Sequence, residues 1–120
     1  MTDDTDRALM EMGDPGTVKK LQTCLVIGQK IGDVLGDLQW AYGELGERAD
    51  GDVLKATTSV VEALNEELSE LMVAASDDCG LPTPVADSYL NYQIQASGGR
   101  LSGRRGALNE LSDTFGRVGY

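Results

Sequence analysis

Residues 24–45, CLVIGQKIGDVLGDLQWAYGEL, decide the fold of this chain. Within them, apolar and small residues recur at alternating steps of four and three, which is the spacing of one stripe along an α-helix. The stripe consists of Cys24, Gly28, Ile31, Leu35, Leu38, Tyr42 and Leu45. Working outward from this stripe, we predict one long helix over residues 17–48.

Glycine recurs every fourth position in the same helix, at Gly28, Gly32 and Gly36. Three interior glycines disfavour a helix by about 2 to 3 kcal/mol relative to alanine, so a compensating contact is expected. Residues four apart share one face, and a face of glycines lets another helix approach closely. We therefore predict a close helix–helix contact there, within the bundle or between copies of the chain. A helix made flexible by glycine is the alternative.

A short turn follows the first helix. The segment 49–52 has turn composition, and Asp50 or Asp52 is a suitable N-cap for a second helix over residues 53–78. Two helices joined this briefly are expected to lie antiparallel. The residues of the second helix that we expect to face inward are Val53, Thr57, Val60, Leu64, Leu68, Leu71 and Ala75.

The end of the second helix is marked by Gly80, which suits a left-handed residue after a helix. Thr83 and Pro84 then fit the N-cap and the first residue of a third helix. From there one apolar stripe keeps helical phase to the C-terminus. It consists of Leu90, Ile94, Ser97, Leu101, Arg104, Leu108, Leu111, Phe115 and Val118.

Four glycines between Gly98 and Gly106 oppose a continuous last helix, because each costs about 0.5 to 1 kcal/mol in a helix interior. We expect a break there, with helices over 84–97 and 106–117. The predicted fold is an all-α, up-down bundle of three long helices, or four if the last one breaks. It forms a single domain over residues 17–120, after an acidic N-terminal tail over residues 1–16.

The overall charge and hydropathy narrow the environment and the partners. A net charge of −10 disfavours nonspecific binding to nucleic acid or to an anionic membrane. The acidic residues 1–6 lack the features of a secretory signal, and no apolar run is long enough to cross a bilayer. We expect a cytoplasmic protein, or one incorporated into a particle assembled there.

The chain has few side chains suited to metal binding or catalysis. The chain has no histidine, and Cys24 and Cys79 lack a metal-binding spacing, so we expect no metal and no cofactor. The two cysteines are expected to be small buried thiols and not a disulfide. No nucleophile has an obvious activating base, so we do not expect an enzyme.

Two charged sets are the remaining candidates for contact with a partner. Three glutamates follow one another at steps of four, which indicates a solvated acidic face or an electrostatic docking surface. A cluster of arginines lies in the glycine-rich segment 98–106, which we expect to be a flexible basic loop. These residues are Glu62, Glu66, Glu70, Arg100, Arg104 and Arg105.

From these features we expect a noncatalytic assembly or structural subunit of a multicopy particle, such as a virion or a secretion-type assembly. Its expected partners are copies of itself and neighbouring proteins, bound through helix packing and charge complementarity, with no nucleic acid and no membrane. The alternative is a small acidic regulatory or inhibitory protein that occupies a basic site on its partner.

Overall fold

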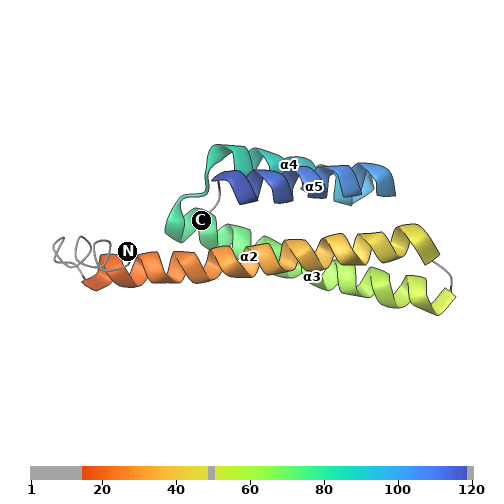
Figure 1. The fold of residues 1–120 in the computed structure, drawn as a ribbon, viewed down its shortest axis with the longest axis horizontal. Helices are drawn as coiled ribbons and strands as arrows, with labels where there is room; N and C mark the ends of the chain where they lie inside the picture. Colours follow the sequence, from red (N-terminus) through yellow and green to blue (C-terminus); the bar gives the residue numbers. More distant parts are fainter. Residues whose placement is uncertain (1–14, 49–50, 119–120) are drawn as a thin grey trace.

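The computed structural model describes residues 15–48 and 51–118 and confirms an all-α helical bundle (Figure 1). The last helix breaks, so the described part of the chain contains four helices and not three. They are α2 (Pro15–Arg48), α3 (Gly51–Cys79), α4 (Thr83–Gly98) and α5 (Leu101–Val118). The acidic tail predicted for residues 1–16 lies outside the described residues as far as residue 14, and so does the predicted cap Asp50.

The four helices form two antiparallel pairs (Figure 1). The long pair is the predicted hairpin of α2 and α3, and the short pair of α4 and α5 lies along one side of it. Close backbone packing joins α2 to α3, α4 to α5, and α2 to α5. The core therefore runs lengthwise between the hairpin and the short pair, with α2 at its centre.

The α2 stripe predicted from sequence is confirmed. Cys24, Gly28 and the other stripe residues up to Tyr42 are buried, and Leu45 at its end is half-buried. Ile31 and Leu38 have no exposed surface at all. The regular spacing of apolar side chains is sufficient to orient α2, because charged residues are absent from that side of the helix.

The α3 stripe is confirmed only in part. Leu68 and Ala75 are buried as predicted, but Val60 is 43% exposed. Its neighbour Val61 is buried in its place, together with Met72. The inward side of α3 therefore includes Val61 and Met72 beside the predicted stripe, since Leu64 and Leu71 also pack against the core.

Asp52 and Thr83 are not the caps predicted for them, whereas the predicted helix stop is confirmed. Gly80 has φ of +70°, the left-handed conformation that ends α3. Asp52 lies within the first turn of α3 and does not precede it. Pro82, and not Thr83, is the N-cap residue of α4, and no side chain caps this end.

The break between α4 and α5 is narrower than predicted. Only Gly99 and Arg100 separate the two helices, so residues 101–105 are helical and not part of a loop. The predicted stripe is confirmed in α5, where Leu108 and Leu111 are buried, but not in α4, because helical phase does not continue across a reversal of the chain. Leu90 and Ile94 are 56% and 62% exposed, and α4 instead buries Val85 and Tyr92.

Candidate functional site

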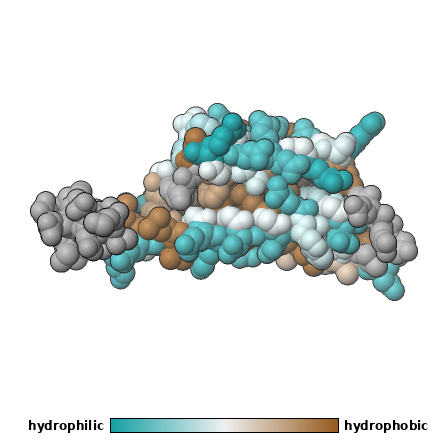
Figure 2. Space-filling model, viewed as in Figure 1, coloured by the Kyte–Doolittle hydropathy of each residue, from teal (hydrophilic) through white to brown (hydrophobic). Residues whose placement is uncertain are grey.

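One exposed side of α2 carries no charged residue from Leu21 to Trp40, about five turns of helix, and the exposed Asp33 borders it. We call this side the outer face of α2, and all of its residues are exposed. They are Leu21, Leu25, Gln29, Gly32, Gly36 and Trp40. In Figure 2, pale surface of intermediate hydropathy runs lengthwise across the molecule, between teal patches.

The three predicted contact glycines do not share one environment. Gly28 is buried, whereas Gly32 and Gly36 are exposed. The reason is geometric: each step of four residues rotates the position by about 40° around the helix. A Cβ atom added at Gly32 or Gly36 would meet nothing within 4 Å. No contact within the described part of the chain therefore requires glycine at these two positions.

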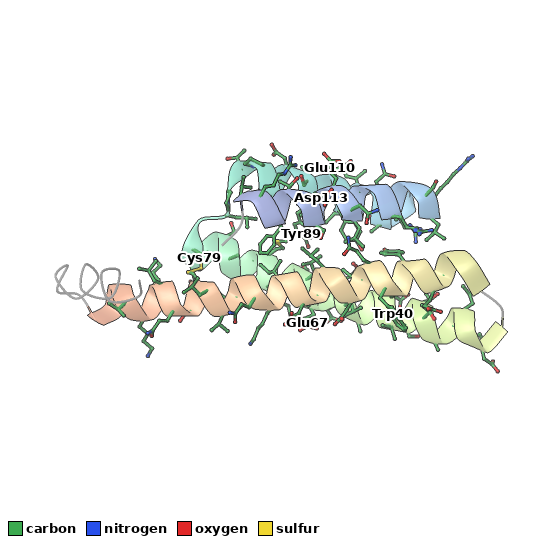
Figure 3. The ribbon with its side chains drawn as sticks, in the orientation of Figure 1. Trp40, Glu67, Cys79, Tyr89, Glu110 and Asp113 are labelled. Atoms are coloured by element: carbon green, nitrogen blue, oxygen red, sulfur yellow. A yellow bond between two sulfur atoms is a disulfide. The ribbon has the colours of Figure 1, made fainter. Side chains whose placement is uncertain are left out.

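Trp40 continues the same four-residue step beyond Gly36, and its side chain is 65% exposed on the outer face of α2 (Figure 3). Leu25 on the same face is 58% exposed. The outer face thus places two large apolar side chains on either side of two open glycines. Sequence analysis did not assign a role to Trp40, although extending the glycine step by one more repeat would have reached it.

The two charged sets lie on different helices. Glu62, Glu66 and Glu70 are all exposed on α3. The arginines lie at the start of α5 and in the residue before it, and no close backbone contact joins α3 to α5 among the described residues. The structure therefore does not bring the two sets together within one chain.

The arginine cluster does not form the flexible basic loop that we predicted. Arg104 lies in the first turn of α5, is half-buried, and donates a hydrogen bond from Nε to the carbonyl oxygen of Gly99 at 3.0 Å. It thus stabilises the reversal between α4 and α5. Arg100 and Arg105 are exposed.

A buried polar network joins α2, α3 and α4. The Tyr92 hydroxyl donates to Oδ1 of Asn65 at 2.6 Å and lies 3.0 Å from the Tyr42 hydroxyl. Because Tyr92 has a single hydroxyl hydrogen, Tyr42 is the donor to Tyr92. Burial, and next the bond with Tyr42, raise the pKa of Tyr92 far above its ordinary value. A phenol that holds its proton this tightly suits packing and not proton transfer.

A small cleft lies between α3 and α4, and Asn65 and Tyr92 of this network form part of its lining. It has a volume of about 210 Å³ and is lined by side chains with hydroxyl and amide groups, including Ser69, Gln93 and Ser97. Ligand pockets usually start at about 300 Å³ and combine an apolar lining with a few directed polar groups. The cleft holds no acid–base pair, since its only titratable side chains are Tyr89 and Tyr92.

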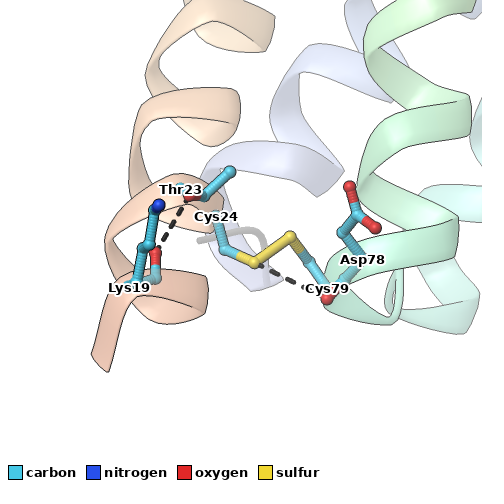
Figure 4. The surroundings of a disulfide bond; sticks show 5 residues. All are labelled: Lys19, Thr23, Cys24, Asp78 and Cys79. Carbon is cyan, nitrogen blue, oxygen red and sulfur yellow. Dashed lines mark hydrogen bonds between the residues drawn. A yellow bond between two sulfur atoms is a disulfide. The ribbon is translucent and has the colours of Figure 1, made fainter. Parts of the chain in front are cut away.

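Cys24 and Cys79 form a disulfide, so the prediction of two free buried thiols is wrong (Figure 4). The bond joins the N-terminal third of α2 to the last residue of α3, and the two Cα atoms lie 5.8 Å apart. Cys24 Sγ also lies 3.9 Å from the Asp78 carbonyl oxygen. This is a van der Waals contact, because a disulfide sulfur carries no hydrogen to donate.

Other candidate chemistry is missing from the described residues. Within residues 15–48 and 51–118, no group of three or more acidic, cysteine or histidine side chains is placed to hold a metal ion. None of the described helices has the length and hydropathy of a bilayer-spanning segment. Comparison with known proteins gives no match to any protein-family model, curated protein or solved structure.

Proposed function

We propose that the protein is a noncatalytic structural subunit that assembles with copies of itself and with neighbouring proteins in a multicopy particle. The observation that carries this proposal is the open environment of Gly32 and Gly36. Each glycine costs about 0.5 to 1 kcal/mol relative to alanine in a helix interior, and the described part of the chain offers no packing reason for either. A second helix lying against the outer face of α2 supplies that reason, since it can approach closely only where side chains are absent.

The surrounding surface supports the same function. Trp40 and Leu25 flank the open glycines with large exposed apolar groups. Tryptophan is among the residues that contribute most to binding energy when they are buried in an interface. A surface with apolar side chains at both ends and a groove of glycines between them is well shaped to receive a helix.

The disulfide bears on the kind of particle. Disulfides persist in oxidising surroundings such as the surface of a virion or the outside of a cell, and they are rare in the cytosol. The Cys24–Cys79 bond therefore favours a particle that leaves the reducing cytoplasm, as a virion or a secretion-type assembly does. We retain the cytoplasm as the proposed place of assembly, with oxidation following export.

A test of this function compares two double variants that change helix propensity equally. Gly32→Ala with Gly36→Ala alters the outer face of α2, whereas Gly106→Ala with Gly116→Ala alters open, exposed positions on α5. Both pairs are expected to raise the free energy of unfolding of the monomer by about 1 to 2 kcal/mol. Only the first pair is expected to weaken self-association, measured by sedimentation velocity at physiological salt. A strictly monomeric wild-type chain, or a Gly32/Gly36 variant that associates as well as wild type, contradicts the proposal.

A second candidate function rests on the exposed glutamates of α3. Glu62, Glu66 and Glu70 follow one another along one side of the helix with no basic residue between them. Such a row fits a basic site on a partner, as in a small inhibitory or regulatory protein. This function predicts a one-to-one complex that raised salt dissociates, because screening weakens exposed charge pairs. A salt-tolerant homo-oligomer favours the structural subunit.

A further inference from the structure

A surface cleft lies beside the disulfide, at the end of the α2–α3 hairpin. It has a volume of about 450 Å³, and both cysteines line it together with Lys20, Leu21 and Gly80. The last three residues are exposed, so the cleft is open to solvent. Cys79 is half-buried, whereas Cys24 is only 8% exposed. A small thiol can therefore reach the bond in the folded chain, and Cys79 is the more accessible of the two residues.

Few other contacts hold the start of α2 in place. Residues 19–23 are all exposed, so they contribute nothing to the core. Among the described side chains of α2 before Gly28, only those of Cys24 and Ile27 are buried, at 8% and 9% exposure. From Ile31 onward, the buried residues of α2 are each at most 4% exposed. The disulfide is thus the main tie on this segment, and the firm packing of α2 begins at Ile31.

The sequence of this segment also disfavours a helix. It contains several β-branched residues and is followed by glycine, both of which lower helix propensity. These residues are Val18, Thr23, Val26, Ile27 and Gly28. The first turn of α2 has no acidic residue to stabilise it through the helix dipole. Without the disulfide, little favours a docked, helical segment before Gly28.

We propose that the Cys24–Cys79 disulfide is a redox switch: reduction by a small thiol frees α2 as far as Gly28, and oxidation docks this segment again (Figure 4). The thiolate of the reductant attacks Sγ of Cys79 and forms a mixed disulfide there. Cys24 leaves as a thiolate and takes up the proton that the first thiol lost. A second thiol attacks the reductant's sulfur in the mixed disulfide and frees Cys79, so two thiols become one disulfide and both cysteines gain hydrogen.

The switch regulates the surface on which the proposed function depends, and it rests on that function. Leu21 lines the disulfide cleft and belongs to the outer face of α2, as does Leu25. Release of the segment before Gly28 removes both leucines from this face and leaves the open glycines and Trp40 in place. Association is therefore weaker in reducing surroundings, and oxidation after export strengthens contacts that were made in the cytoplasm.

The reactivity of Cys24 in a Cys79→Ser variant tests the release directly, because Cys24 is then the sole thiol of the chain. In dilute, freshly reduced protein, Cys24 is expected to react with an aromatic disulfide within roughly tenfold of its rate in the urea-unfolded chain. The matched control is Ala41→Cys in the Cys24→Ser, Cys79→Ser background, at a position of α2 with no exposed surface. It should react at least about a hundredfold more slowly than when unfolded. Ala75→Cys on α3, also without exposed surface, replaces it if circular dichroism shows a loss of helix.

Sedimentation velocity with and without a dithiol reductant tests the effect on assembly. Wild type is expected to associate roughly tenfold more weakly when reduced, and Cys24→Ser with Cys79→Ser should associate weakly in both conditions. If Cys24 is as protected as the control thiol, or if reduction leaves association unchanged, the switch is refuted and the structural-subunit function stands. A wild-type chain that is monomeric in both conditions overturns that function and the control of assembly with it, and the thiol measurement alone then decides the release.

Discussion

The two helix pairs of this molecule are held together by different means. The α2–α3 hairpin is long, buries a continuous apolar stripe of α2, and is closed at one end by the Cys24–Cys79 disulfide. The α4–α5 pair is short and has no covalent link to the hairpin other than the chain itself. It depends on packing of α5 against α2 and on the buried hydroxyl of Tyr92, which hydrogen-bonds to both helices of the hairpin.

This difference separates the proposed contact surface from the rest of the core. The hairpin is a self-contained rod whose outer side is free, and the short pair covers the opposite side of α2 and completes the core. The proposed assembly surface therefore belongs to the pair that the disulfide closes. A cross-link that restricts a contact surface before binding reduces the conformational entropy lost on binding.

The largest expected effect comes from removing the disulfide. The bond closes a loop of 55 residues, for which chain-entropy arguments give about 4 kcal/mol of stabilisation. We expect Cys24→Ser with Cys79→Ser to lower the free energy of unfolding by about 2 to 4 kcal/mol, measured by urea denaturation. The hairpin would then be held together, like the short pair, by noncovalent packing alone.

Reductant provides the control for this experiment. It should lower the stability of wild type to that of the double serine variant and leave the variant unchanged. A thiol assay on the denatured, unreduced protein should detect no free thiol. Two thiols in that assay, together with insensitivity to reductant, would instead support the free cysteines expected from the sequence.

The disulfide also shows what sequence analysis could and could not establish. Spacing alone gave no reason to pair Cys24 with Cys79. The predicted hairpin did contain the information, because its turn at residues 49–52 lies almost midway between the two cysteines. Helix direction and the α2 stripe were predictable from periodicity. Pairings between helices follow only when the hairpin is folded in three dimensions.

The second effect concerns the link between the two pairs. Tyr92→Phe removes the donor to Asn65 and the acceptor for Tyr42, and it leaves the buried Tyr42 hydroxyl and the half-buried Asn65 side chain without that partner. We expect a loss of about 1 to 3 kcal/mol in the free energy of unfolding. Tyr89→Phe is the control on the same helix and is expected to change it by less than about 0.5 kcal/mol. Equal effects of the two variants would show that the network does not hold the pairs together.

Tyr92 also predicts a pH dependence. Its pKa is raised in the folded state, chiefly by burial, so the folded chain keeps the proton at pH values where the unfolded chain has released it. The stabilising contribution is complete below about pH 10, the usual tyrosine pKa, and is lost as the pH rises further, by up to about 1.4 kcal/mol per pH unit. Urea denaturation at about pH 9 and about pH 11 should therefore show a smaller loss for Tyr92→Phe than for wild type. Equal losses of unfolding free energy in the two proteins would show that Tyr92 is not the source of the pH dependence.

The short pair is also where sequence analysis was least successful. The predicted stripe failed in α4, where Leu90 and Ile94 are exposed, although the reversal at Gly99 left its α5 residues Leu108 and Leu111 buried. In α2 no such break occurs, so its stripe was correct over its whole length. Similarly, the open environment of Gly32 and Gly36 could not be read from their spacing, because it depends on where α3 and α5 pack.

The smallest effects are expected at the junction of α4 and α5, where Gly99 and Gly103 both lie against Gln95. A Cβ atom at Gly99 would lie 2.7 Å from the backbone carbonyl oxygen of Gln95, which cannot move without disturbing the end of α4. A Cβ atom at Gly103 would meet the end of the Gln95 side chain, which can rotate away. Gly99→Ala is therefore expected to lower the free energy of unfolding by about 1 to 2 kcal/mol.

Gly103→Ala should instead leave stability unchanged or raise it by up to about 1 kcal/mol, because alanine favours the first turn of α5 once Gln95 has moved. The opposite signs form the test, and urea denaturation of both variants decides it. Adding Gln95→Ala should make Gly103→Ala more stabilising and leave Gly99→Ala destabilising, since the main-chain oxygen stays in place. If Gln95→Ala also restores the stability of the Gly99→Ala variant, the Gln95 side chain, and not its carbonyl oxygen, constrains the junction. The turn of the short pair would then be less strictly determined than the hairpin.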